Sequence, residues 1–261
     1  MRITRTIAET RVALAGAGDV GLVPTMGAYH AGHVALFSAA RRESETVVAS
    51  LFVNPAQFGD GTDLARYPRD EAADAAVAEE QGVDVLFAPA AEELYPPGYE
   101  TWIEVEKTSR GLEGDARPGH FRGVATICLK LFNIVSPDRA YFGQKDAQQV
   151  EVIRRMIRDL DLVIDLRIVP TVRDEDGLAL SSRNTLLSDG ERSVALALPR
   201  ALATRDPARA KEMLEGLDVD YVEVAPFDPP VLAGAVRVGS VRLIDNVPLN
   251  NTAPFDQGGK G

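Results

Sequence analysis

The sequence predicts an α/β protein with a doubly wound parallel sheet, followed by a smaller C-terminal α+β domain. Two observations support this class. Short apolar runs without polar alternation are separated by stretches of helical periodicity, which is typical of a parallel sheet covered by helices on both faces. After Pro170 the order changes, and helices are followed by three strand-like runs. A chain of 261 residues with 45% apolar content is long enough for both parts.

The elements follow from these patterns in chain order. Helical spacing of apolar residues predicts helices over residues 7–17, 31–42, 70–81, about 121–135 and 147–159. Apolar runs between them predict strands at 20–23, 46–53, 83–87, 101–105, 140–142 and 162–169. In the second domain we expect helices near 191–203 and 207–214 and strands at 220–224, 235–238 and 241–244. The predicted domains are 1–170 and 171–261, and the tail at 251–261 is expected to be disordered.

Composition narrows the class of protein. The net charge of −11 argues against nucleic-acid binding and against anionic membranes, although a local basic cluster still permits a small anionic substrate. The single cysteine, Cys128, excludes an intramolecular disulfide and a cysteine-based zinc site, and its apolar surroundings favour burial. No signal region and no apolar run of about 18 residues is visible, so we expect a cytoplasmic protein without a membrane partner.

Two of the three histidines, His30 and His33, fall in one turn between an expected strand and an expected helix. A helix N-terminus presents N–H groups and partial positive charge to a phosphate, and Gly32 would let a ligand approach the backbone. The imidazoles would donate hydrogen bonds to charge developing on phosphorus oxygens. Two other interpretations remain open. One is a metal site with His120 as third ligand, and the other is a pair of capping or core histidines.

A glycine pattern upstream imitates a cofactor site. Gly16, Gly18 and Gly21 are spaced as in dinucleotide-binding loops, but there a strand precedes the glycines and a helix follows. Here the order is reversed, so we expect a loop that ends the first helix.

Two further segments offer groups for a nucleotide. At the exit of the strand expected at 140–142, Lys145 would meet a phosphate as a point charge and Asp146 would accept from ribose hydroxyls; the alternative is a solvated helix start. At the domain junction, Ser181, Ser182 and Arg183 suit terminal phosphates and would close over a nucleotide from the second domain.

Amides follow the strand expected at 46–53. Asn54 and Gln57 are neutral partners for a hydroxyl and a carboxylate, and they would not blunt the nucleophilicity of the carboxylate as full charges would. The alternative is a simple Asn-Pro turn. The loop at 117–122 adds two arginines, either as a mobile basic flap or as an ordinary surface loop.

Together these segments resemble the pantothenate synthetase (pantoate–β-alanine ligase) family. The motifs occur in family order: Pro24-Thr-Met-Gly…His30-x-Gly-His33, Phe52-Val-Asn-Pro-x-Gln57-Phe, Arg117-Pro-Gly-His-Phe-x-Gly123, Phe142-Gly-x-Lys-Asp-x-Gln-Gln149, Ser181-Ser-Arg-Asn184 and Arg242-Leu-Ile-Asp-Asn246. The resemblance implies the nucleotidylyltransferase superfamily, with a Rossmann-like adenylating domain, a C-terminal lid and a homodimer. It implies ATP-dependent condensation of (R)-pantoate with β-alanine through pantoyl adenylate, with Mg²⁺, in the coenzyme A pathway.

The resemblance also assigns roles residue by residue. His33, His30 and Lys145 are expected to be catalytic, with His33 as a proton donor or phosphate stabiliser. Pantoate is expected to contact Gln57, Gln149, Asn54 and Met26, and Gln57 also borders the β-alanine position. Asp74 aligns with an acidic helix start linked to Mg²⁺ in some members. Residues expected to contact ATP are Met26, Gly27, His30, Gly32, His33, Gly143, Gln144, Lys145, Asp146, Val172, Leu180, Ser181, Ser182 and Arg183.

Some residues depart from the family pattern. Gln144 stands where Glu is usual and Ala147 where an aromatic is usual, and the stretch at about 200–217 is short, which bears on lid closure. One alternative is a nucleotidylyltransferase that moves AMP or CMP onto a phosphorylated alcohol and needs no amine. Another is a protein that binds ATP without turnover. A tRNA synthetase with a similar histidine signature is disfavoured by the acidic charge and the short chain.

Overall fold

The computed structural model describes residues 1–59, 64–65 and 67–250, so the expected disordered tail at 251–261 lies outside the described residues. The chain forms two compact units. The first comprises Met1–Tyr29, His33–Phe142 and Val152–Val169, and the second comprises His30–Gly32, Gly143–Glu151 and the chain from Pro170 onward. Two short segments that we assigned to the first domain, 30–32 and 143–151, therefore group with the second unit.

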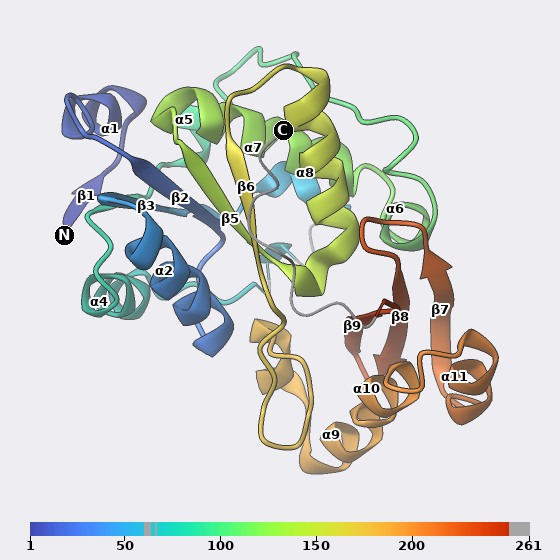
Figure 1. The fold of residues 1–261 in the computed structure, drawn as a ribbon. Helices are drawn as coiled ribbons and strands as arrows, with labels where there is room; N and C mark the ends of the chain where they lie inside the picture. Colours follow the sequence, from blue (N-terminus) through green and yellow to red (C-terminus); the bar gives the residue numbers. More distant parts are fainter. Residues whose placement is uncertain (60–63, 66, 251–261) are drawn as a thin grey trace. The chain divides into compact units, whose positions relative to one another are not determined.

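A six-stranded sheet with the order β1-β4-β3-β2-β5-β6 forms the centre of the first unit (Figure 1). Neighbouring strands from β1 through β5 pair in parallel. The strands are β1 Arg2–Thr4, β2 Val20–Thr25, β3 Thr46–Leu51, β4 Val85–Phe87, β5 Arg139–Gly143 and β6 Asp165–Val169. The strand order reverses between β2 and β5, and open α/β sheets bind ligands beyond the carboxyl ends of the strands at such a point. The predicted parallel α/β class is confirmed.

Helices cover both faces of this sheet (Figure 1). Phe37 of α2 and Ala78 of α4 pack with Val23, Val47 and Leu86 in one buried cluster, so α2 and α4 lie on the same face. The helix α7 is buried along most of its length and contacts α1 and β2. Right-handed crossovers place α1 and α7 on the face opposite α2 and α4. The connections through α2 and α4 run in one direction across the sheet, and those through α1 and α7 run in the other. The helices outside the C-terminal region are α1 Ile7–Ala13, α2 Ala31–Glu43, α4 Glu71–Glu80, α5 Ala91–Leu94, α6 Leu112–Ala116, α7 His120–Val135 and α8 Ala147–Asp159.

In the first unit, one predicted strand was wrong and one strand was not predicted. The strand expected at 101–105 is irregular backbone, and the N–H of Ile103 donates to the Thr126 hydroxyl of α7 at 3.0 Å instead of pairing with a strand. The strand β1 was missed because only three residues form it and its order comes from pairing with β4, which no local pattern reveals.

The second unit contains an antiparallel sheet with the order β7-β8-β9, formed by Asp218–Ala225, Val231–Val238 and Val241–Pro248. Leucines of α10, Leu198 and Leu202, pack with Leu232 and Val236 of β8 in its core. The helix expected at 191–203 is two helices, α9 Asp189–Ala195 and α10 Ala197–Leu202, and α11 spans Pro207–Met213. The predicted smaller α+β part is confirmed.

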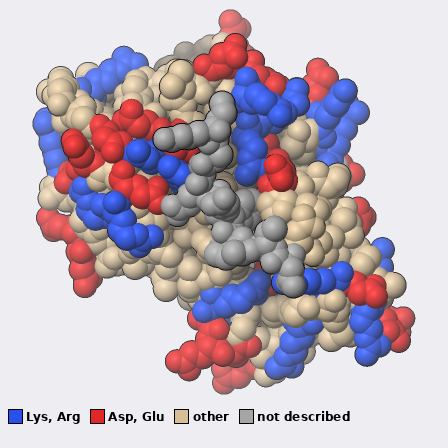
Figure 2. Space-filling model, viewed as in Figure 1, with Lys and Arg blue, Asp and Glu red and all other residues tan. Residues whose placement is uncertain are grey.

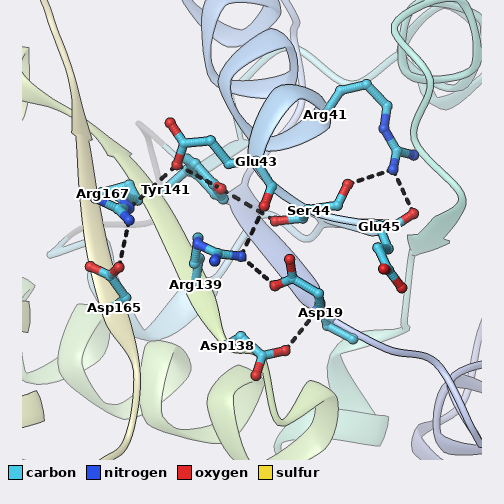
Figure 3. Close-up of polar contacts among 11 residues, drawn as sticks. Asp19, Arg41, Glu43, Ser44, Glu45, Asp138, Arg139, Tyr141, Asp165 and Arg167 are labelled. Atoms are coloured by element: carbon cyan, nitrogen blue, oxygen red, sulfur yellow. Dashed lines mark hydrogen bonds and ion pairs between the residues drawn. The ribbon is translucent and has the colours of Figure 1, made fainter. Parts of the chain in front are cut away.

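Charged residues form hydrogen bonds and ion pairs near the amino-terminal ends of strands in the first sheet (Figure 3). Arg139 pairs with the carboxylate of Asp19 and donates to the main-chain carbonyl of Glu43 at 2.9 Å. The Glu43 carboxylate accepts from the Tyr141 hydroxyl at 3.3 Å and pairs with Arg167 at 3.3 Å. These contacts join the end of α2 to the starts of β2 and β5. They lie at the amino-terminal ends of the strands, opposite the carboxyl ends where open α/β sheets bind ligands.

Acidic and basic side chains are interspersed over the face shown in Figure 2. Many of the cations have acidic partners, as when Arg192 bonds both Asp174 and Asp176. Within the described residues, no helix combines the length and apolarity that crossing a bilayer would require.

Candidate active site

The turn after β2 is held by a buried carboxylate from α4. Both oxygens of Asp74, which is 4% exposed, accept backbone N–H bonds, from Ala28 at 2.9 Å and from Tyr29 at 2.8 Å. Gly27 has a φ of +89°, and a Cβ there would lie 2.6 Å from both Asp74 Oδ2 and Leu51 Cδ1. The glycine of the Pro-Thr-Met-Gly motif is therefore required by this turn itself.

Tyr29 connects this turn to His33. The hydroxyls of Thr25 and Tyr29 are hydrogen-bonded at 3.0 Å, and the Tyr29 ring lies 5.1 Å from Phe37 and 5.2 Å from the imidazole of His33, measured between centroids. Burial raises the pKa of Tyr29, so it stays a neutral phenol. The position of the His33 ring is thus coupled, through Tyr29, to the carboxylate of Asp74.

Amides after β3 form a second group in the first unit. The Asn54 side-chain amide donates to Gln57 Oε1 at 2.9 Å and to the carbonyl of Gly123 at 3.2 Å. Its own oxygen accepts from Ala56 and starts the short helix η1, Pro55–Gln57. Gln57 Nε2 lies 3.2 Å from the sulfur of Met26. Of the residues expected to bind pantoate, Met26 and Asn54 therefore both contact Gln57.

His120 orients Gln57 by bonding its backbone carbonyl, a role that we did not predict from the sequence. The imidazole is buried; Nδ1 lies 2.9 Å from the carbonyl oxygen of Gln57 and Nε2 lies 3.1 Å from Arg117 Nη1. The guanidinium can only donate, so Nε2 accepts and Nδ1–H donates. Gly123 permits this packing, because a Cβ there would lie 2.3 Å from the carbonyl oxygen of Ala56. The signal was the Arg-Pro-Gly-His motif itself, which we interpreted as either a mobile basic flap or an ordinary surface loop.

A cavity of about 380 Å³ adjoins the turn after β2. The described residues that line it include Met26, Leu51 at the end of β3, and the charged residues Arg69, Asp70, Glu71 and Asp74. Among these described residues acidic groups outnumber cations, so we do not assign pantoate to this cavity.

The second unit brings together four residues expected at the ATP site. The N–H of Gly32 donates to His30 Nδ1 at 3.1 Å, and a Cβ at Gly32 would lie 2.8 Å from the His30 ring and 4.0 Å from the Leu180 Cβ. Burial and the positive charge of Lys145 lower the pKa of His30 to about 4, against the opposing effect of Asp174. His30 is therefore neutral at pH 7, and because Nδ1 accepts, Nε2 carries the proton and can donate.

The structure gives Gly32 a different role from the one that we predicted. Gly32 was expected to leave open backbone for a phosphate, but its N–H already bonds the His30 ring and its missing side chain makes room for that ring. His30 thus also has the capping role that was left open. The first turn of α2 carries no acidic residue of its own.

Most of the other expected nucleotide residues lie on two loops of the second unit, whereas Met26, Gly27 and His33 belong to the first unit. Gln144, Lys145 and Asp146 form the short helix η2, which leads into α8 with Gln149 in its first turn. Ser181 begins the short helix η3, Ser182–Leu186, by accepting from the N–H of Arg183 at 3.3 Å. Gly143 precedes the first loop, and Val172 and Leu180 pair through their backbones at the base of the second.

Metal coordination by the protein alone does not fit the described residues. Among them, no group of three His, Cys, Asp or Glu side chains is arranged to hold a metal ion. Both ring nitrogens of His120 have protein partners, and both oxygens of Asp74 accept from the backbone. A magnesium ion bound together with a nucleotide is held by phosphates, waters and one or two carboxylates, so it would not require a group of three protein ligands.

Comparison with known proteins identifies the family. The family profile described as Pantoate-beta-alanine ligase matches residues 2–248. The chain belongs to the pantoate–β-alanine ligase family. A pantothenate synthetase of Heliobacterium modesticaldum is 51% identical over 87% of this chain and 90% of that protein, and one of Chloroflexus aurantiacus is 50% identical over 94% and 97%.

Solved structures of the same family agree. Pantothenate synthetase of Thermus thermophilus superposes with a TM-score of 0.90 at 45% identity, covering 95% of this chain and 99% of the other. Pantoate-beta-alanine ligase of Francisella tularensis, solved in complex with beta-gamma ATP and beta-alanine, gives a TM-score of 0.85 at 33% identity, covering 95% and 98%. The chain is thus an enzyme of pantothenate biosynthesis, a ligase that joins pantoate to β-alanine.

Proposed function

We propose that this ligase activates (R)-pantoate with ATP before β-alanine enters. A carboxylate oxygen of pantoate attacks the α-phosphorus, the bond to pyrophosphate breaks, and pantoyl adenylate forms. The β-alanine amine then attacks the acyl carbon, the bond to AMP breaks, and the amine loses a proton to give pantothenate. The Francisella tularensis relative, solved with beta-gamma ATP and beta-alanine, supports the choice of two of these substrates.

The observation that carries the proposal is the position of His30 in the second unit, where it bonds the N–H of Gly32 beside Leu180 and is close enough to Lys145 for the lysine charge to act on it. Lys145 supplies a cation and His30 supplies a neutral N–H donor, since burial and the lysine charge lower the pKa of His30 to about 4. A triphosphate needs positive charge and donors that stay fixed while charge moves between its oxygens. We assign Lys145 to the phosphates and Asp146 to the ribose. The other proposed ATP contacts are Met26, Gly27, Gly32, His33, Gly143, Gln144, Val172, Leu180, Ser181, Ser182 and Arg183.

Pantoate is assigned to Gln57 and Gln149, with Asn54 and Met26 beside Gln57. Neutral amides orient a carboxylate by hydrogen bonds without the charge neutralisation that would weaken it as a nucleophile. His33 is proposed to donate a hydrogen bond to the phosphorus oxygens in the transition state, where a preorganised donor contributes most. Little covalent work is left to the protein, and catalysis is mainly positioning.

Mg²⁺ is proposed to enter with ATP. When bound it would neutralise phosphate charge, and the assignment of Asp74 to this metal stays a prediction. The two backbone hydrogen bonds that Asp74 accepts support a positioning role instead. A homodimer working in the cytoplasm is proposed from the family resemblance.

An omission assay tests this function. With ATP, Mg²⁺, pantoate and β-alanine present, the enzyme should release AMP and pyrophosphate, and omission of β-alanine should stop turnover after one pyrophosphate for each active site. A nucleotidylyltransferase would show no requirement for the amine, and an ATP-binding protein without activity would show no turnover. Either result refutes the proposal.

A further inference from the structure

Two adjacent buried residues of β9, Asp245 and Asn246, hold different loops of the second unit. Each is 3% exposed, although both are polar. Successive side chains of a strand point to opposite faces of the sheet, so neighbouring residues can reach two separate segments. The loops that they contact are 143–146 and 172–180, which carry most of the proposed nucleotide contacts of this unit.

Asn246 fixes the lysine loop through its backbone. Its side-chain amide donates to the carbonyl oxygen of Gln144 at 3.0 Å and to that of Lys145 at 2.9 Å, so both amide hydrogens are used on consecutive residues. The orientation of the amide follows, because the reverse orientation would direct its oxygen at two carbonyl oxygens. These bonds are made to the backbone and do not use the ammonium group of Lys145. They fix the backbone from which the Lys145 side chain extends.

Asp245 fixes the second loop through an arginine. Its carboxylate receives two bonds from Arg173, at 2.7 Å and 3.0 Å, and the same guanidinium donates to the carbonyl of Gly177 at 3.1 Å. The backbone N–H of Asp174 donates to the carbonyl of Leu178 at 2.9 Å and closes the loop. Asp245 also accepts from the N–H of Asn246 at 2.8 Å, which couples the two holding residues.

We propose that Asp245 and Asn246 are positioning residues for ATP, Asn246 by setting Lys145 and Asp245 by setting the loop that ends at Leu180. This inference rests on the proposed function, because it takes these loops to be the nucleotide-binding loops. Neither residue is proposed to touch ATP. A misplacement of about 1 Å in a residue that contacts substrate is enough to lower rates on the order of 10²-fold.

Steady-state kinetics of Asn246→Ala and Asp245→Asn test the proposal. Asn246→Ala removes two hydrogen bonds, so kcat/KM for ATP should fall by about 5- to 150-fold, while KM for pantoate stays within about twofold of wild type. Asp206→Ala is the matched control, because Asp206 caps α11 in the same unit by accepting from the N–H groups of Ala208 and Arg209, and α11 packs against α10 and β7. If Asp206→Ala lowers kcat/KM for ATP as much as Asn246→Ala does, the role is merely structural and the proposal is overturned.

Hydrogen–deuterium exchange separates this proposal from the proposed function. Asn246→Ala should speed exchange at 143–149 and leave 172–180 near wild type, whereas Asp245→Asn should do the reverse. Uniform acceleration across the second unit, or none in either loop, overturns the positioning roles whatever the activity. A wild-type enzyme that releases no AMP refutes the proposed function, and with it the link to ATP, while the exchange pattern still decides whether each residue holds its loop.

Discussion

Replacement of Asp74 tests whether this carboxylate orders the turn after β2 or binds metal. Its two oxygens accept N–H bonds of 2.9 Å and 2.8 Å from Ala28 and Tyr29. Hydrogen bonds to charged groups contribute about 1.5–3 kcal/mol each. Asp74→Asn keeps one acceptor and points an amide N–H at the other backbone donor, so the free energy of unfolding should fall by about 1.5–3 kcal/mol. Asp74→Ala loses both bonds, with an upper bound of about 6 kcal/mol.

The consequence for activity follows from the contacts of the turn. Tyr29 packs against the His33 ring, so loosening the turn should lower the rate of pantoate-dependent pyrophosphate release while the half-saturating Mg²⁺ concentration stays unchanged. Asp70→Ala is the matched control. Asp70 caps the same helix by accepting from Ala73 at 3.0 Å and does not bond the turn, so its loss should cost about 1 kcal/mol of stability and leave kcat intact.

Urea unfolding and magnesium titration together decide this case. If Asp74→Asn shifts the Mg²⁺ requirement upward and leaves the unfolding free energy at the wild-type value, Asp74 is a metal ligand and the reasoning fails. If Asp70→Ala lowers kcat as strongly as Asp74→Asn, general loosening of α4 explains the effect.

Three more predictions concern the proposed contacts. His33→Ala and Lys145→Ala should each lower the rate of pyrophosphate release by about 10²–10³, and rates within about threefold of wild type would contradict their roles. Gln57→Ala should weaken pantoate binding in calorimetry by about 10-fold or more, with unchanged affinity in a folded variant counting against it. His30 has its pKa lowered to about 4 from 6.5, so its contribution to stability is fully present above pH 6.5 and is lost as the pH falls toward 4. His30→Gln should therefore flatten the urea-unfolding free energy in that window, and an unchanged pH dependence would refute the burial of a neutral ring.

Much of the fold was predictable because its pattern is local. Helix α8 spans Ala147–Asp159, the range that apolar spacing predicts, since a long helix repeats its signal over several turns. The three residues of β1 repeat nothing, and their order depends on β4, more than 80 residues away. Residues 101–105 have a strand-like composition, but the Thr126 hydroxyl takes a backbone donor that a strand would need.

The sequence nominates candidate site residues but does not reveal the residues that hold them in place. Motifs point to His30, Lys145 and Gln57 because residue types suited to binding phosphates and carboxylates are concentrated there. The contact between Asp74 and Tyr29 joins residues 45 positions apart, and that between Asn246 and Lys145 joins residues 101 positions apart. Such pairs leave no periodic trace in one sequence, so Asp74 was expected at Mg²⁺, Asn246 was noted only as part of a motif, and the supporting role of neither was predicted.

The supporting residues share one physical device, which is a buried polar side chain bonded to main-chain atoms. Asp74 accepts from the N–H of Tyr29, His120 donates to the carbonyl of Gln57, and Asn246 donates to the carbonyl of Lys145. A bond to the backbone sets the direction of a functional side chain without using any of its polar atoms or shifting its pKa directly. Burial makes the arrangement firm, because breaking it would leave a buried group unpaired at a cost of about 1–3 kcal/mol. Rigid placement of this kind is what a reaction governed by positioning requires, since the donors must already point to where charge develops.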